Sequence, residues 1–288
     1  MELDRALPGW LAPSLGVLSF ALVTWVETLR PLRAVRHGKP RRILRNVATG
    51  ALAAVPAGLQ GLLLAPVLVW VDRERIGLLH AFEIAPWLQV ALGFLLLDAT
   101  LWIWHWLNHA VPFLWRFHLV HHVDQDLDSS TALRFHFGEM ALSVPWRLGQ
   151  VVLIGSSPLA LSVWGTALLV SILFHHGNAQ LPLRFERALV RIVVTPRMHG
   201  IHHSTVRAER NTNYSSLLTV WDWLFGTLLL SVPQQRVRIG VPPFDEADER
   251  RVSFGCITAL PFRDEASSGL RDAQGPPRMQ SRASRLAE

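Results

Sequence analysis

Residues 86–109 read PWLQVALGFLLLDATLWIWHWLNH, and this stretch decides the class of fold. Its apolar part, residues 86–104, is about as long as the 20 residues that a helix needs to cross a bilayer. The pair His105 and His109 follows directly. The stretch therefore predicts a membrane helix that ends in two possible metal ligands.

The chain on both sides of this stretch is also apolar. Only 17% of the 288 residues are charged, against about 25% in soluble domains, and mean hydropathy is +0.25. The tetrapeptide Gly155-Ser156-Ser157-Pro158 is typical of a turn between two helices. We predict an all-α integral membrane bundle of four to five membrane helices and no nucleic-acid partner. The further apolar stretches lie at residues 10–26, 47–71, 140–154 and 159–174.

Basic residues between the first two apolar stretches set the orientation. Loops rich in arginine and lysine stay on the cytoplasmic side of a membrane. Counting crossings from this loop places His105 on the cytoplasmic side, together with the chain from His175 onward. Arginines and one lysine alone determine this topology, so the common location of the histidines is an independent check. The basic residues are Arg30, Arg33, Arg36, Lys39, Arg41, Arg42 and Arg45.

The histidines recur at helical spacing. Residues three and four apart share one face of a helix, so each cluster is expected to direct its imidazoles at a common point. Neutral imidazole is a frequent ligand of iron, zinc and copper, and a single cysteine, Cys256, excludes a cysteine-rich site. The clusters are His105 and His109, then His118, His121 and His122, then His199, His202 and His203.

With His175 and His176, ten histidines are available. They are too many for one ion and enough for two ions with four or five ligands each. All-nitrogen ligation with open positions suits redox iron that activates O2, and zinc would accept the same ligands. Haem would need only one histidine from each of two helices, which leaves the repeated HxxHH pattern unexplained. We therefore predict two iron ions, with zinc possible in purified protein.

Three polar residues are candidates to support the ligands. Asp98 lies on one helical stripe with His105 and His109, so its carboxylate is predicted to accept a ligand N–H and fix the tautomer. The alternative for Asp98 is a polar contact between helices. His136 and Glu139 share a helical face, and they either support the site or gate its substrate, or else cap and charge a helix end.

The motifs taken together resemble the fatty acid hydroxylase/sterol desaturase superfamily, whose pattern is HxxxH, HxxHH and a final HxxHH. The match runs from about Asp98 to Thr227. Gly200 departs from the pattern, because arginine is common there, and so does Trp223. Similar segments are Arg134-Phe135-His136 with Glu139, Phe174-His175-His176-Gly177-Asn178, Asn213-Tyr214, and Trp221-Asp222 with Leu224-Phe225-Gly226-Thr227.

The resemblance implies a membrane bundle under a cytosolic, histidine-lined helical cap. It implies a non-haem di-iron centre that uses O2 and two electrons to hydroxylate or desaturate a C–H bond of a lipid. His176 is the favoured ligand over His175, and Asn178 is placed beside the ligands. The stretch after the last box is similar to the same stretch in bacterial members. The resemblance therefore also implies a bacterial inner membrane. The electron donor would be a separate ferredoxin, cytochrome or reductase.

Four segments are predicted along the chain. Residues 1–85 hold the N-terminal membrane helices and the basic loop, 86–232 the di-iron domain, 233–263 a C-terminal extension and 264–288 a disordered tail. Two other functions remain open for the same histidines. One is a zinc-dependent membrane lipid hydrolase, and the other is a non-enzymatic membrane metal-binding protein.

Overall fold

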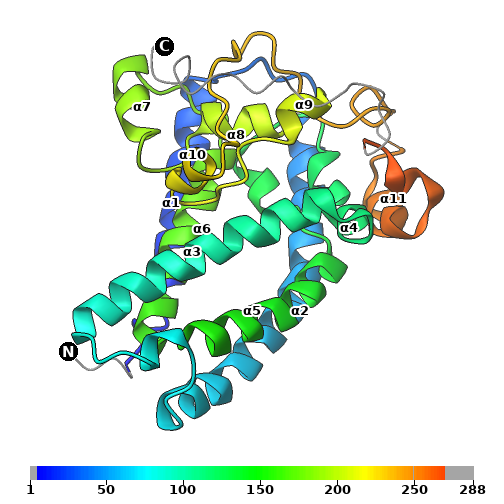
Figure 1. Cartoon of the computed structure of the whole chain (residues 1–288). Coiled ribbons are helices and arrows are strands. Elements are labelled where there is room, and N and C mark those ends of the chain that lie inside the picture. Colours follow the sequence, from blue (N-terminus) through cyan, green and yellow to red (C-terminus); the bar gives the residue numbers. More distant parts are fainter. Residues whose placement is uncertain (1–4, 249, 270–288) are drawn as a thin grey trace.

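The computed structural model describes residues 5–248 and 250–269 (Figure 1), and within these ranges the chain forms helices and no extended strand. The predicted all-α class is confirmed. The six longer helices are α1 (Leu11–Leu29), α2 (Lys39–Arg73), α3 (Pro86–Ala110), α4 (Pro112–His122), α5 (Phe137–Ile154) and α6 (Pro158–His176). The short α-helices are α7 (Leu183–Leu189), α8 (Pro196–His202), α9 (Arg207–Arg210), α10 (Val220–Leu224) and α11 (Phe254–Ala259). The 3-10 helices are η1 (Leu78–His80), η2 (Ser129–Leu133), η3 (Leu260–Phe262) and η4 (Asp264–Ser267).

Four helices, α1, α2, α3 and α6, are long and apolar enough to cross a membrane. Many large apolar side chains of α1, α2 and α3 point outward rather than into the protein. Leu62 of α2 is 75% exposed and Val17 of α1 is 72% exposed. Apolar surface on this scale is stable only when lipid covers it. The chain is therefore an integral membrane protein with four candidate spans.

The stretch predicted as a further span, residues 140–154, forms most of α5. This helix is not among the four candidates. It carries Glu139, Arg147 and Gln150 in 18 residues, which lowers its hydropathy. It packs lengthwise along α2 and leads into the predicted turn. Gly155 ends α5 in the left-handed region, with φ +72°, and the Ser157 hydroxyl accepts from the Ala160 N–H to begin α6.

The packing of the long helices gathers the histidine-bearing ends on one side. Helix α1 lies along α6, and α3 contacts α4, α5 and α6. The C-terminal ends of α3, α4 and α6 consequently meet in the upper part of the molecule, where α8 covers them (Figure 1). The prediction that all histidine clusters share one side of the bundle agrees with this arrangement.

Helix α2 begins at Lys39, well before the apolar stretch predicted from residue 47. Its polar first turns enter the part of the molecule that holds the histidines. There the buried Arg42 guanidinium donates to the carboxylates of Asp124, at 3.0 Å, and Asp128. Because these partners lie on another segment, hydropathy alone could not place the start of the helix.

The first residues of the predicted disordered tail, 264–269, are described and are packed. Residues 264–267 form η4, Ala266 is buried, and the Trp115 indole donates to the Ser268 carbonyl at 2.9 Å. The anchoring residue lies on α4, far away in the sequence, so composition could not reveal it. The rest of this predicted tail, 270–288, lies outside the described residues.

Candidate metal centre

Nine buried histidines form two groups at the meeting point of α3, α4, α6 and α8. In each group, one potential ligand atom from every residue lies within 4.8 Å of the others. The groups adjoin, since the rings of His122 and His203 stack with centroids 4.4 Å apart. The five-histidine group is His105, His109, His118, His122 and His202, and the four-histidine group is His121, His176, His199 and His203.

Each HxxHH box is divided between the two groups. His118 and His122 of α4 belong to the five-histidine group, whereas His121 belongs to the other. The sequence prediction that each cluster shares one target is therefore wrong for these boxes. The reason is helical geometry: residues four apart differ by about 40° around the axis, but adjacent residues differ by about 100°.

The second box repeats this division in the opposite sense. His199 and His203 belong to the four-histidine group, and His202 reaches the five-histidine group. Helices α4 and α8 thus each send two imidazoles to one group and one to the other. Each box links both groups, which keeps the two groups adjacent.

Four of the nine ligand candidates are held through Nδ1 by a backbone carbonyl. Carbonyl oxygens can only accept, so the Nδ1 atom carries the proton and the Nε2 lone pair is free. The Nδ1 acceptors are Tyr214 O for His105 (2.6 Å), Arg134 O for His121 (3.2 Å), Ile172 O for His176 (2.8 Å) and Thr212 O for His202 (2.8 Å).

The free lone pairs face one another. His121 Nε2 and His176 Nε2 are 3.0 Å apart, and both rings already donate through Nδ1. Two lone pairs at this distance repel each other unless a cation attracts both. Within the described residues, His105 Nε2, His202 Nε2 and both ring nitrogens of His109 have no hydrogen-bond partner. The donor set therefore fits metal ions that prefer nitrogen ligands.

Burial keeps the imidazoles neutral. Desolvation, followed by the neighbouring imidazoles, lowers the pKa of His121, His122, His199 and His203 well below 6.5. The pKa of His202 is lowered in the same way, again chiefly by burial. A neutral imidazole is the form that binds a metal, so these residues are prepared as ligands at neutral pH.

Of the two histidines that end α6, only His176 lies in a group. The ring of His175 packs against His199, with centroids 4.1 Å apart, and it also interacts with the backbone of Ser216. The structure thus places His176 among the candidate ligands and His175 beside them.

Glu139 supports a candidate ligand directly. Its Oε1 atom lies 2.8 Å from His118 Nδ1, and both side chains are buried. His136 instead caps α5, because its Nδ1 accepts from the Gly138 N–H at 2.9 Å while its Nε2 lies 3.0 Å from the Thr258 carbonyl. Of the two roles weighed for this pair, Glu139 takes the supporting one and His136 the capping one.

The prediction that the Asp98 carboxylate accepts the N–H of a ligand histidine is wrong. Its carboxylate accepts from the indoles of Trp221, at 2.7 Å, and Trp164, at 3.3 Å, and from the Leu218 N–H at 3.1 Å. Seven residues of helix separate it from His105, which is about 10 Å along the axis and too far for an imidazole contact. Asp98 therefore fastens the 217–221 segment to α3, which is the packing alternative.

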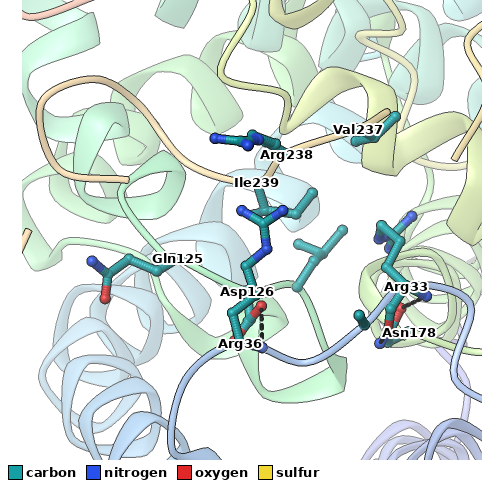
Figure 2. A pocket seen from close by; sticks show the side chains of 10 residues that line it. Arg33, Arg36, Gln125, Asp126, Asn178, Val237, Arg238 and Ile239 are labelled. Atoms are coloured by element: carbon teal, nitrogen blue, oxygen red, sulfur yellow. Dashed lines mark hydrogen bonds between the residues drawn. The ribbon is translucent and has the colours of Figure 1, made fainter. Parts of the chain in front are cut away.

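Asn178 binds the basic loop rather than an imidazole. Its side chain accepts from the Arg33 N–H at 2.9 Å and donates to the Arg33 carbonyl at 2.8 Å, as Figure 2 shows in part. Asn178 is near the candidate ligands only because it follows His176 by two residues in the chain. The loop and the end of α6 are fixed to each other by these bonds.

The departure at Gly200 has a structural explanation. The buried guanidinium of Arg33 lies against Gly200, and Nη1 donates to the Pro196 carbonyl at 3.3 Å and to Gln234 at 2.6 Å. A Cβ atom at residue 200 would collide with this guanidinium. Burial, and then the nearby Arg197, lowers the pKa of Arg33 to about 10, so it remains a cation at neutral pH.

Sequence reasoning assigned no role to Asp222, which organises one wall of the site. Its carboxylate accepts from the Trp102 indole at 3.0 Å, from the N–H groups of Tyr214 and Ser215 at 2.8 Å each, and from the Thr227 hydroxyl at 2.6 Å. These bonds position the loop whose carbonyls hold His105 and His202. The Trp-Asp pair of the family resemblance was the available signal.

A buried ion-pair network supports the other wall. Burial alone would raise the pKa of Asp124, but Arg42 and Arg134 outweigh it and lower that pKa. The Arg134 guanidinium also donates to the Val120 carbonyl at 2.8 Å and to the Asn46 side chain at 2.9 Å. The network fixes the segment that contributes the Arg134 carbonyl to His121.

Comparison with known proteins agrees with this site. Residues 90–227 match a family model described as fatty acid hydroxylase. The chain is 38% identical over 141 residues to ornithine lipid hydroxylase OlsE of Rhizobium tropici, covering 48% of this chain and 41% of the relative. It is 30% identical over 203 residues to human alkylglycerol monooxygenase, covering 67% and 43% of the two chains.

Human cholesterol 25-hydroxylase is 33% identical over 153 residues, covering 48% of this chain and 51% of the relative. The chain therefore spans about half the length of the curated relatives it matches. No solved structure matches. The matched region contains all nine histidines of the two groups.

Proposed function

Because the chain belongs to the fatty acid hydroxylase family over residues 90–227, we propose that it is a membrane-bound, O2-dependent di-iron lipid hydroxylase. The observation that carries the proposal is the convergence of nine buried histidines in two adjoining groups. The relatives are named as a hydroxylase of ornithine lipid, a monooxygenase of alkylglycerol and a hydroxylase of cholesterol. For this chain we propose the substrate class that these names share, a lipid with an alkyl chain or ring.

The nine histidines are the proposed ligands, five for one ion and four for the other. His175 is left out, because its ring lies outside both groups. Iron is favoured over zinc because zinc enzymes normally use only three protein ligands per ion. Bound here, two iron ions would supply the O2-activating chemistry by which a C–H bond, O2, two electrons and two protons become an alcohol and water.

The residues of the chain orient the ligands and exclude water. Backbone carbonyls and Glu139 fix the rings before an ion binds, which preorganises the site. Tyr214 lies edge-on to His105 and His202, with centroids 5.7 Å apart in each case. Burial, and then the Asp222 carboxylate, raises the pKa of Tyr214, so the phenol keeps its proton. Buried aromatic rings thereby separate the five-histidine group from water.

We also propose that the site faces the cytoplasm. The loop between α1 and α2 carries Arg33 and Arg36 and lies on the histidine side of the bundle, which agrees with the positive-inside rule. Electrons would come from a separate protein such as a ferredoxin, cytochrome or reductase. The matched residues 90–227 fall inside the predicted domain 86–232, which we retain as the catalytic unit.

The test is purification in nanodiscs from iron-supplied cells without chelators, followed by metal analysis and lipid mass spectrometry. We expect about two iron atoms per chain, and O2 uptake that matches the appearance of a lipid heavier by one oxygen. A lipid lighter by two hydrogens would show desaturation instead. Lipid cleavage without O2 uptake would show a hydrolase. Less than one metal per chain would contradict the di-iron centre.

A further inference from the structure

Two segments, residues 183–192 and 220–225, carry exposed apolar side chains that the proposed site does not use. Ile192 is 64% exposed, Phe185 is 56% exposed and Leu224 is 56% exposed. We call the exposed apolar side chains of α7, α10 and the residues that follow each helix the interfacial patch. It comprises Leu183, Phe185, Ile192, Val220, Trp223, Leu224 and Phe225.

The two segments that carry the patch are bonded to each other through their backbones. The Thr219 N–H donates to the Ile192 carbonyl, and the Val194 N–H donates to the Leu217 carbonyl, both at 3.0 Å. Helix α7 is fastened to α8 by the buried Glu186, whose carboxylate accepts from Arg197 Nε at 2.9 Å. The end of α7 and the start of α10 are thus held in one surface.

The depth of α10 is set by a membrane span. Asp98 lies in α3, a candidate membrane span, and within its apolar part, residues 86–104, it is in the half nearer the histidines. The Trp221 indole and the Leu218 N–H both bind the Asp98 carboxylate, at 2.7 and 3.1 Å. The first turn of α10 therefore lies beside the spanning part of α3, and its outward face is at the level of lipid rather than of bulk water.

The charges around the patch favour an anionic membrane surface. Arg184, Arg187 and Arg191 are all exposed on and just after α7. The acidic residues of the same segments, Glu186 and Asp222, are buried and bound to other partners. Arginine side chains can reach lipid phosphates while their stems and the neighbouring apolar side chains enter the leaflet.

The geometry points to the interfacial patch as a membrane-binding surface that rests in the leaflet on the histidine side, between phosphate groups and acyl chains. It extends the lipid-covered surface of α3 to α10. Phe225 stacks on Trp102 of α3, with centroids 4.3 Å apart, and Trp102 lies one turn before His105. A lipid bound along α10 is therefore next to the five-histidine group. Only this last consequence rests on the proposed hydroxylase function.

The test is site-directed spin labelling of the full chain in nanodiscs of phosphatidylcholine and phosphatidylglycerol. Cys256 is the single cysteine, so a Cys256→Ser background accepts one label at a time. We would label Leu224→Cys and Ile192→Cys in the patch. Leu62→Cys serves as the lipid-exposed control and Arg238→Cys as the water-exposed control. Power saturation then compares collisions with O2, which concentrates in lipid, and with a water-soluble nickel chelate.

We expect both patch labels to resemble the Leu62→Cys label, with more O2 than nickel collisions. The Arg184→Gln/Arg187→Gln pair should raise nickel access in these anionic nanodiscs and change little in nanodiscs of phosphatidylcholine alone. Patch labels that behave like the Arg238→Cys label would overturn the inference. So would low access to both reagents with dipolar broadening, which would indicate a second copy on the patch. Neither result depends on iron or turnover, so the proposed function is tested separately.

Discussion

The two histidine groups are built from the same two boxes but have different surroundings. Aromatic rings line the five-histidine group: Trp115 lies 5.0 Å from His109 and Tyr214 lies 5.2 Å from it, between centroids. The four-histidine group has one stacked ring, Phe135 on His121 with centroids 4.6 Å apart, and a buried cation nearby, the Arg33 guanidinium against Gly200 of α8. The comparison teaches that similar spacing in sequence produces unequal sites, one lined by Trp115 and Tyr214 and one beside the buried Arg33 of the basic loop.

The largest effect is expected from two adjacent histidines at the end of α8, which belong to different groups. His202→Ala removes a ligand candidate from the five-histidine group, and His203→Ala removes one from the four-histidine group. Both variants should lose turnover to background, a larger loss than the 10–100-fold that roughly follows removal of a ligand's hydrogen-bond partner. Iron per chain should fall from about two to about one.

Mössbauer spectra of the two variants should differ, because each retains the ion of the other group. Identical spectra would contradict the division of the boxes. Full activity in either variant would contradict the ligand assignment.

Substitutions behind the ligands should affect one group at a time. Glu139→Gln weakens the acceptor of His118, and we expect roughly 10–100-fold weaker metal binding at the five-histidine group.

Gly200→Ala displaces Arg33 from α8 and disturbs the four-histidine group, at a cost of about 1–3 kcal/mol in folding stability. Metal titration of the apoprotein with thermal unfolding separates the two effects, and Gly165→Ala, where a Cβ meets open space, is the control for the second.

The metal-free protein should lose stability as the pH falls below about 6.5. Burial lowers the folded-state pKa of His121, His122, His199 and His203, so the unfolded chain binds more protons below the ordinary value of 6.5. Stability is then present above pH 6.5 and is lost progressively toward the lower folded-state pKa values.

The thermal midpoint of the apoprotein between pH 8 and pH 5 measures this loss, and a flat profile would contradict it. In the iron-loaded protein protons compete with the ions, so release should begin at lower pH. We expect it in two steps, with the four-histidine group first because it has one ligand fewer.

The smallest effect is expected from His175→Ala. This ring packs on His199 without joining either group, so iron content should stay near two per chain and the apparent metal affinity should change by less than about threefold, or 0.7 kcal/mol. His176→Ala is the matched comparison and should lose iron. Equal losses in both variants would make His175 a ligand as well.

Local patterns made much of the fold predictable. Apolar length predicted α1, α2, α3 and α6, because a helix that crosses a bilayer must satisfy its own backbone and expose apolar side chains to lipid. The spacing of His118, His121 and His122 likewise predicted a ligand-bearing helix. The start of α2 was less well predicted, since its first turns bind buried partners on a distant segment. The stretch 140–154 forms most of α5, but this helix is not among the candidate membrane spans.

The sequence by itself determined that this protein is a helical membrane protein whose histidines collect on one side, because length, hydropathy and helical spacing are properties of single segments. Only the tertiary structure decided which ring joins which group, since adjacent residues of a helix point about 100° apart and their targets lie on other helices. It also decided the partners of Asp98, Asn178 and Gly200. Those contacts join residues distant in the chain, and they depend on how the bundle is packed.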